Sequence, residues 1–374
     1  MSDASANEPL APPEPAVVRR KRRTLFMPQA IMMRMVYALL PILAAGIYFF
    51  GWRVLALAAA CLVGGVGMEW VMTSRRGKPI SQACFVTVLL YALSLPPTMP
   101  FWMAFVGVVV AILFGKEVFG GFGRNFANPA IVGRAFVYIA FPTQMTGSFV
   151  PAFRGFPGGF GHWSLLGLPR LPEWLSPALK SGVAAVTAAT PMWSRRDFGY
   201  EAPLLNLFLG NIGGTFQGEY GPKVLAAGAI GEVSAALILL AAVYLLVTKT
   251  ANWRLMAGPL IGAVAANVVF RNLAGVNLVP PLPFTLLSGA LLYGTVFMVT
   301  EPISAPKKSP SVWVYGILIG ALIVFMRWKA QFAGAVGFAI LIGNIVGPSL
   351  DMAVTAWEER RKAAQAGPAE GAKP

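Results

Sequence analysis

The chain has 374 residues, of which 56% are hydrophobic and only 12% are charged, and its mean hydropathy is +0.65. Soluble domains carry about 25% charged residues, so this composition excludes a disordered chain, argues against an ordinary cytosolic enzyme and fits a polytopic membrane protein. The two cysteines, Cys61 and Cys84, and the single histidine, His162, cannot build a disulfide framework, a thiolate metal centre or a bis-histidine haem site, so we expect no metal site.

The net charge of +15 is gathered in short Lys/Arg clusters at the ends of apolar runs. This placement favours basic cytoplasmic loops of a membrane protein over nucleic-acid binding. Residues 1–30 are rich in Pro and Ala and then basic, and we expect a disordered cytoplasmic tail there rather than a cleaved signal peptide. A second cytoplasmic tail is expected at 358–374, which leaves 31–357 as the membrane domain.

Ten apolar segments follow one another in the membrane domain, and several reach the length of about 20 residues that a spanning helix needs. Two of them, 82–95 and 130–141, are short and end at prolines, which suggests helices that stop inside the membrane and line a cavity. We therefore expect an all-α fold of about ten transmembrane helices, some short or broken. The segments are 31–50, 53–71, 82–95, 101–115, 130–141, 231–248, 254–270, 283–299, 311–326 and 331–352.

The distribution of Lys and Arg between the loops predicts the orientation of the bundle. If the N-terminus is cytoplasmic, most basic loop residues fall in inner loops, with Arg271, Arg327 and Lys329 as exceptions. Both termini are then cytoplasmic, and the long segment 143–230 is external. A loop of this length is usually functional, although its tryptophans also fit a simple membrane-surface loop.

A short pattern occurs twice along the chain. Leu95-Pro96-Pro97 precedes an apolar segment that ends at Lys116-Glu117, and Pro280-Pro281-Leu282-Pro283 precedes one that ends at Thr300-Glu301. The chain thus either contains two related halves, as many transport folds do, or shows a chance match.

Carboxylates are scarce, and several lie in or at the ends of apolar segments, among them Glu117, Glu301 and Asp351. Because an ionised carboxylate in hydrocarbon is costly, such groups usually face a protein interior or an aqueous path. They are candidates for cation or proton handling, and the alternative is that they cap helix ends or pair with basic loops.

The residues around Gly120 and Gly121 are unusually rich in glycine and lead through Asn128-Pro129 into an apolar segment. Glycine allows positive φ angles and a close backbone approach, and a helix N-terminus binds anions. The stretch is therefore either a tight cytoplasmic turn or a backbone-lined pocket for a planar or anionic ligand.

The same stretch carries the most specific resemblance of the sequence. Residues 115–136, GKEVFGGFGRNFANPAIVGRAF, resemble the B subunit of the Na+-translocating NADH:quinone oxidoreductase, whose family also includes the D subunit of the Rnf electron-transport complex. Gly231-Glu232, residues 297–305 and the run from Gly343-Asn344 to Asp351 support this resemblance, which covers roughly residues 30–360. The Lys-Glu-Val-Phe and Gly-Arg-Ala-Phe pieces favour the quinone-reductase subunit over the Rnf-type subunit of ferredoxin:NAD+ electron transport.

The resemblance implies a covalent flavin. In this family a flavin transferase, acting outside the cytoplasm, attaches FMN through its phosphate to the threonine of a Ser-Gly-Ala-Thr motif. The matching residues here read Thr187-Ala188-Ala189-Thr190, so Thr190 is the expected attachment site. Ala188 replaces the glycine and Ala184 the usual upstream aspartate, which leaves open a flavin-free transporter of the same fold.

Two arginines follow the expected attachment site. Arg195 and Arg196 could pair with the negative phosphodiester, or they could extend to the membrane interface as long basic side chains often do.

The resemblance also implies a noncovalent riboflavin as the next carrier and a quinone site near Gly120 and Gly121. Glu117, Glu301 and Asp351 become candidates for the path of Na+ or H+. The expected partners are the other subunits of the complex, quinone, the flavin transferase and membrane lipid, with no nucleic acid, and the expected location is the bacterial inner membrane.

Overall fold

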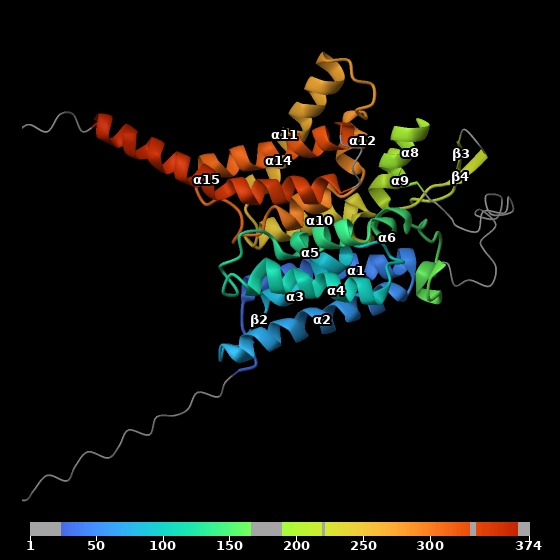
Figure 1. Ribbon diagram of the computed structural model, residues 1–374. Coiled ribbons are helices and arrows are strands. Elements are labelled where there is room, and N and C mark those ends of the chain that lie inside the picture. The colour runs from blue at the N-terminus through green and yellow to red at the C-terminus, as the bar shows by residue number, and fades with distance from the viewer. Residues whose placement is uncertain (1–23, 166–188, 219–220, 330–333, 366–374) are drawn as a thin grey trace, which may run out of the picture.

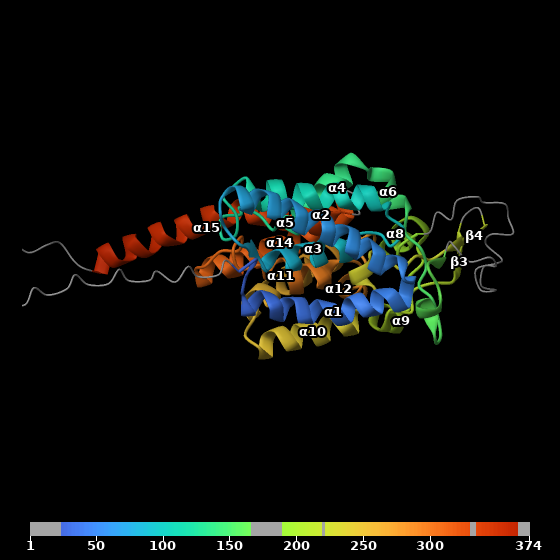
Figure 2. The same cartoon turned by 90° about the horizontal axis from the view of Figure 1, so that it is seen from below.

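The computed structural model describes residues 24–165, 189–218, 221–329 and 334–365, and these are mainly helical. Within these ranges, five helices are long and apolar enough to cross a membrane. They are α1 (Ala30–Phe50), α2 (Arg53–Arg75), α11 with its continuation η5 (Trp253–Asn267 and Val268–Leu273), α14 (Ser309–Lys329) and α15 (Ala335–Gln365). Most helices run along one common axis (Figures 1 and 2). The predicted all-α polytopic membrane fold is confirmed.

The first part of the bundle is completed by short helices, as the proline positions predicted. These are α3 (Ala83–Leu93), α4 (Phe101–Ile112) with the π-helical turn η1 (Leu113–Glu117), and α5 (Pro129–Ala140). The α3 helix ends just before Pro96, and α5 ends where Pro142 opens the short helix α6 (Pro142–Gly147). Proline has no N–H to donate and fixes its own φ angle, so a helix stops or restarts there.

The last part of the bundle contains one expected span that is broken. After η4 (Ile230–Glu232) and α10 (Ala235–Val247), the segment expected at 283–299 consists of α12 (Leu282–Leu287), α13 (Leu291–Tyr293) and the π-helical turn η6 (Gly294–Met298). The break falls at Ser288-Gly289, where Gly289 has a φ of +65°. Only glycine adopts this conformation at little cost.

The twofold sequence pattern has a structural counterpart. Glu117 follows Pro96 at the same separation as Glu301 follows Pro280; the π-helical turn η1 ends at Glu117, and η6 ends three residues before Glu301. Such turns are rare and are often found at functional sites. Lys116 and Glu301 line the same small cavity, so both segments run in the same direction along the bundle. These features favour two related halves over a chance match.

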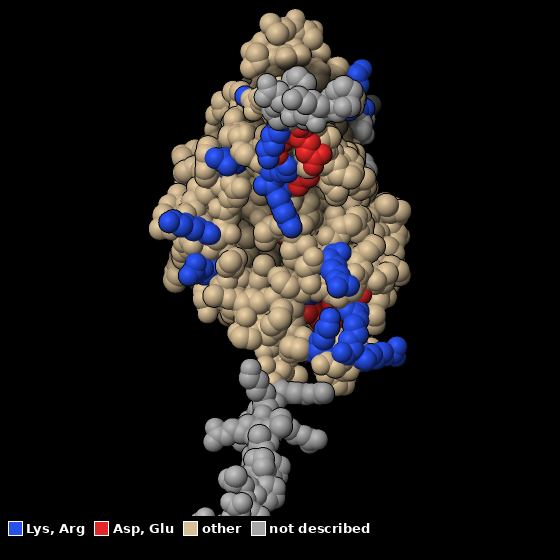
Figure 3. Space-filling view, turned by 90° about the vertical axis from the view of Figure 1, so that its left-hand side faces the viewer, with Lys and Arg blue, Asp and Glu red and all other residues tan. Residues whose placement is uncertain are grey.

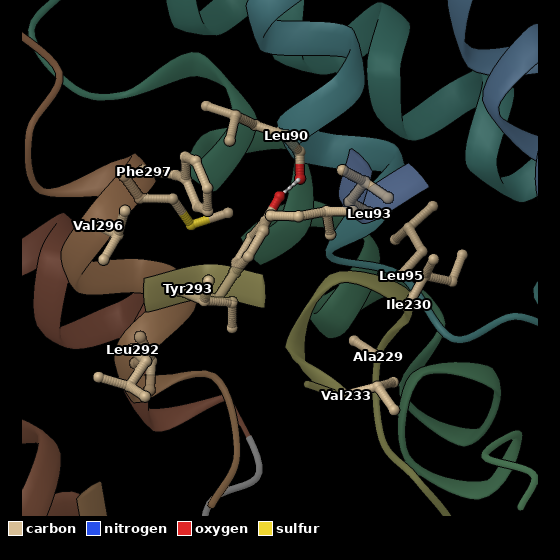
Figure 4. Packing of buried hydrophobic residues seen from close by; sticks show 14 of the residues in the cluster. Leu90, Leu93, Leu95, Ala229, Ile230, Val233, Leu292, Tyr293, Val296 and Phe297 are labelled. Atoms are coloured by element: carbon tan, nitrogen blue, oxygen red, sulfur yellow. Dashed lines mark hydrogen bonds between the residues drawn. The ribbon is translucent and has the colours of Figure 1, made fainter. Parts of the chain in front are cut away.

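The two halves are packed together by buried apolar side chains around Tyr293. Its hydroxyl donates a hydrogen bond of 3.1 Å to the carbonyl of Leu90, so a residue of α13 is fixed to α3. Figure 4 shows Leu90 and Leu93 close to this ring, Phe297 one turn further along, and Ile230 beside Leu95.

The segment between α6 and η4 lies at one end of the bundle (Figure 1). Its described parts are η2 (Gly158–Gly161), α8 (Pro191–Phe198), α9 (Leu204–Leu209) and the antiparallel pair β3 (Thr215–Gly218) and β4 (Gly221–Val224). This end is opposite to the one at which α1 begins and α15 ends.

Parts of both expected tails belong to the folded chain. Phe26–Met27 form strand β1, which pairs in parallel with β2 (Ile80–Ser81). The α15 helix continues beyond the expected boundary at 357 to Gln365. The folded region is therefore wider at both ends than the apolar segments alone indicated.

Candidate functional site

A cavity of about 300 Å³ opens where α8 meets the bundle, and Thr190 lines it. Thr190 is half-buried and is the residue directly before α8, in an extended conformation. Its position is fixed by its neighbour: the Ala189 amide donates to the Val224 carbonyl, and the Ala226 amide donates to the Ala189 carbonyl, both at 3.0 Å. Ala184, Thr187 and Ala188 lie outside the described residues.

Three arginines from separate helices line the same cavity: Arg134 of α5, Arg196 of α8 and Arg327 of α14. Arg327 donates to the carbonyls of Thr285 (3.1 Å) and Ser288 (3.2 Å), which fixes it across the break after α12. Arg134 makes no hydrogen bond and no ion pair within the described part of the chain. The cavity lining therefore holds three guanidinium groups.

One carboxylate, that of Glu232, also lines the cavity. It accepts a hydrogen bond of 2.7 Å from the Ala229 amide, and its charged neighbours are Arg134 and Arg327. Neither guanidinium lies within ion-pair distance of it. Glu232 therefore offsets only part of the positive charge.

The rest of the lining suits a planar ligand. Aromatic side chains come from α5, α8, α14 and the segment after α6, and the remaining lining residues are mostly apolar. The cavity volume is at the lower end of the range for small-molecule sites. The aromatic lining residues are Tyr138, Phe149, Trp193 and Trp328.

The two arginines expected beside the attachment site separate. Arg196 lines the cavity and forms an ion pair with Asp197, and this contact holds the pKa of the Asp197 carboxyl below its usual range. Arg195 instead pairs with Glu201 at 2.6 Å and does not line the cavity. Of the pair, only Arg196 is placed with Thr190.

A second group of functional candidates lies at the opposite end of the bundle. Gly120 and Gly121 form a turn with φ angles of +108° and +94°. A Cβ atom on Gly121 would lie 3.1 Å from the Arg76 guanidinium. Arg76 in turn pairs with the buried Glu117 carboxylate at 2.9 Å and donates to the Glu117 carbonyl at 2.7 Å. The glycine turn therefore rests directly on the Arg76–Glu117 pair.

Glu301 lies near this turn. Its carboxylate accepts hydrogen bonds from Asn125 (3.0 Å) and from the amide and hydroxyl of Ser304. It lines a small cavity of about 30 Å³ together with Lys116, whose ammonium pairs with Glu69 at 2.7 Å.

Asp351, the third carboxylate of the expected ion path, has different surroundings. It accepts hydrogen bonds from the amides of Lys307 (2.9 Å) and Lys308 (3.2 Å), just before α14 begins. Its contacts are those of a helix-capping residue.

Residues of both regions fall within a match to a known protein family. The model of the NQR2, RnfD, RnfE family matches residues 20–358, which include the large cavity and the glycine turn. The chain belongs to this family. Three bacterial relatives are named as the B subunit of Na(+)-translocating NADH-quinone reductase. The relative from Azotobacter vinelandii is 35% identical over 314 residues, which is 82% of this chain and 68% of the relative.

The other two relatives are similarly close. The one from Pseudomonas aeruginosa is 32% identical over 311 residues, covering 82% of this chain and 68% of the relative. The one from Haemophilus influenzae is 32% identical over 331 residues, covering 86% and 71%. The family resemblance expected from residues 115–136 is thus confirmed.

Two arginines of the cavity were not predicted as site residues, although the sequence carries a signal for each of them. Arg134 stands within an otherwise apolar helix, and Arg327 is one of the basic residues that do not fit the expected inner loops. A charged residue inside a membrane helix indicates a functional site in its own right. Among the described residues, no group of three or more His, Cys, Asp or Glu could hold a metal ion.

Proposed function

We propose that this chain is the membrane subunit of an Na+-translocating NADH-quinone reductase, carries FMN on Thr190 and passes electrons towards quinone. The names of the relatives support the complex and favour it over the Rnf-type alternative. The observation that carries the flavin assignment is the position of Thr190 on an arginine-lined, aromatic cavity.

The residues around Thr190 fit the phosphate of FMN as well as its ring. The phosphodiester would be joined to the threonine directly before α8, where unpaired amides and the helix dipole favour a negative charge. Arg196 would pair with it by a charge-assisted hydrogen bond. The bound flavin supplies the electron transfer, and the protein supplies position, electrostatics and exclusion of water.

Quinone reduction and ion transport would take place at the opposite end of the bundle. Quinone would bind near Gly120 and Gly121, and the path of Na+ or H+ would use Glu117, Glu301 and Asp351. A noncovalent riboflavin would connect the FMN with the quinone. The redox step can move an ion only if reduction changes the affinity or access of a carboxylate site; the Arg76–Glu117 pair beneath the glycine turn is where we expect this change.

In the membrane the chain would be surrounded by partner proteins and lipid. Other subunits deliver the electrons, a flavin transferase outside the cytoplasm attaches the FMN, and lipid surrounds the bundle. The chain would lie in a bacterial inner membrane with both termini in the cytoplasm. The first and the last described residues lie at the same end of the bundle, which supports this arrangement.

In-gel fluorescence of the denatured protein tests the flavin assignment. The chain is produced together with a flavin transferase, and Thr190→Val is compared with Thr187→Val. We expect a fluorescent band that is lost only in Thr190→Val, and mass spectrometry of the peptide containing Thr190 should show the added FMN. Loss of fluorescence in Thr187→Val alone would move the site.

A dark band in the unchanged chain would favour the flavin-free transporter of the same fold. The replacement of the usual motif residues by Ala184 and Ala188 is the observation that keeps this second function in view. Its distinguishing property would be ion transport by the chain without a redox substrate.

A further inference from the structure

We propose that the cavity beside Thr190 binds the isoalloxazine ring of the flavin, and that Arg134 and Arg327 hold the ring edge that becomes negative on reduction. This inference rests on the proposed function, because it takes FMN on Thr190 as given. It assigns a ligand to Arg134, which lies in the Gly-Arg-Ala-Phe piece of the sequence without a role given to it there, and a role to Arg327 beyond its contacts with the protein.

Arg134 is a cation of the cavity whose counter-charge is not supplied by the described part of the chain. It stands within the short apolar helix α5, is only partly exposed and faces the cavity without a hydrogen bond or ion pair from the described residues. A charged group away from bulk water is costly unless an anion or hydrogen-bond acceptor accompanies it. A ligand with a negative or strongly accepting edge would provide the missing partner.

Glu232 does not provide this partner within the protein. Its carboxylate accepts from the Ala229 amide at 2.7 Å and forms no ion pair with either arginine. With Arg196 paired to Asp197, Glu232 offsets only one of the two remaining charges, those of Arg134 and Arg327, and leaves the lining with an excess of positive charge. The expected ligand is therefore an anion, or becomes one.

The shape and lining of the cavity point to a flat, mostly apolar ring system. Trp193 and Trp328 line the cavity, as do Tyr138 and Phe149, and rings of this kind pack against planar ligands. Thr190 lines the same cavity, so a ring tethered to its side chain needs no further opening to enter. Arg196 lies within two helical turns of Thr190 and is therefore placed to contact the phosphate. Arg134 and Arg327 come from other helices and are placed to contact the ring.

The chemistry of flavin explains why cations should face the ring. The oxidised ring is neutral, and uptake of two electrons and one proton leaves one negative charge at the N1–C2 carbonyl edge. In the proposed complex the electrons come from NADH through the partner subunits and leave to quinone. Guanidiniums beside this edge stabilise the reduced ring more than the oxidised ring, and so raise the reduction potential.

Redox titration of the Thr190-linked flavin in the purified complex tests the proposal. We expect Arg134→Gln to weaken the stabilisation of the reduced ring about tenfold, which lowers a two-electron potential by about 30 mV. Arg134→Lys should recover part of the shift, because it keeps the charge. Arg195→Gln is the matched control, since Arg195 pairs with Glu201 outside the cavity, and should leave the potential unchanged.

A measurement on the unchanged complex covers the case in which Arg134→Gln does not assemble. Iodide should quench the fluorescence of the Thr190-linked flavin far less than that of free FMN, because the cavity shields the ring. Equal quenching, or an unchanged potential in Arg134→Gln with flavin present on the gel, overturns this inference and leaves the proposed function standing. Absence of flavin from Thr190 in the unchanged chain overturns both.

Discussion

Three charged side chains near the glycine turn, those of Glu69, Lys116 and Glu117, are buried. Glu69 is inaccessible to solvent and Lys116 nearly so, and their charged groups are 2.7 Å apart. Glu69 also accepts a hydrogen bond of 2.8 Å from the Ser81 amide. The pair thus ties α2 to η1 and to the strand β2 that follows α2. Desolvation of such a pair consumes much of its Coulomb energy, but removing one partner leaves a buried charge alone.

We therefore predict that Lys116→Met lowers the free energy of unfolding by about 3–5 kcal/mol, because it leaves the Glu69 carboxylate without its counter-ion. Thermal or denaturant unfolding of the purified protein in detergent measures this loss. The double variant Glu69→Gln with Lys116→Met should lose less than the sum of the two single variants, since it leaves no unpaired charge.

The exposed pair Lys308–Glu358 provides the control for this prediction. Its charged groups lie 2.6 Å apart, but its side chains are 31% and 40% exposed. Glu358→Gln should therefore change stability by about 1 kcal/mol or less. If Lys116→Met and Glu358→Gln lowered the free energy of unfolding equally, the buried pair would contribute no more to stability than the exposed pair.

At the level of helices, α11 and α14 are held together by small residues. Gly258 on α11 faces Gly316 on α14, Gly262 lies against the backbone of Ile317, and Gly320 lies against the backbone of Pro259. A Cβ atom on Gly320 would lie 1.9 Å from the Pro259 carbonyl oxygen, and one on Gly316 2.8 Å from the Gly258 Cα. The backbones are thus in direct contact. This is a common way to pack helices in lipid, where apolar side chains gain little from leaving their surroundings.

Gly320→Val should therefore destabilise the protein by about 1–3 kcal/mol through overpacking. We expect a value in the upper part of this range, because the new side chain would meet backbone atoms, which cannot move aside as a flexible side chain can. Gly67→Val in α2 is the matched control, since a Cβ there meets nothing within 4 Å and the helical context is the same. The midpoint of thermal unfolding in one detergent compares the two variants. A larger loss in Gly67→Val than in Gly320→Val would be incompatible with close packing at Gly320.

Elements and sites differ in how far the sequence predicts them. The apolar segments located the helices, because each helix is encoded by a contiguous run, and prolines marked the short ones. The break at Ser288-Gly289 was missed, since apolar residues continue on both sides of it. The cavity could not be assembled from the sequence, because Arg134, Thr190 and Arg327 come from distant positions and only packing brings them together. Thr190 was predicted from the resemblance to the family, because the residues around it show no pattern that indicates a site.

For the whole molecule, the positions of Lys and Arg at the two ends of the bundle agree with the predicted orientation, and two of the apparent exceptions have contacts within the protein. The end at which α1 begins and α15 ends shows clusters of Lys and Arg with few carboxylates (Figure 3). Arg327 and Arg271 did not fit the expected inner loops. Arg327 lines the large cavity and Arg271 donates to the Val279 carbonyl, so both are engaged inside the protein at the opposite end. Neither opposes the preference for basic residues in cytoplasmic loops.

Cysteine labelling can decide this orientation, because both native cysteines, Cys61 and Cys84, are buried and should give little background. Thr143 is exposed in α6 at the Thr190 end, and Ala364 is exposed near the end of α15. In spheroplasts of a bacterium producing the chain, a membrane-impermeant maleimide should label Thr143→Cys and spare Ala364→Cys. Inverted membrane vesicles should give the reverse. Labelling of Ala364→Cys from outside would place Thr190 in the cytoplasm, where the proposed flavin transferase does not act.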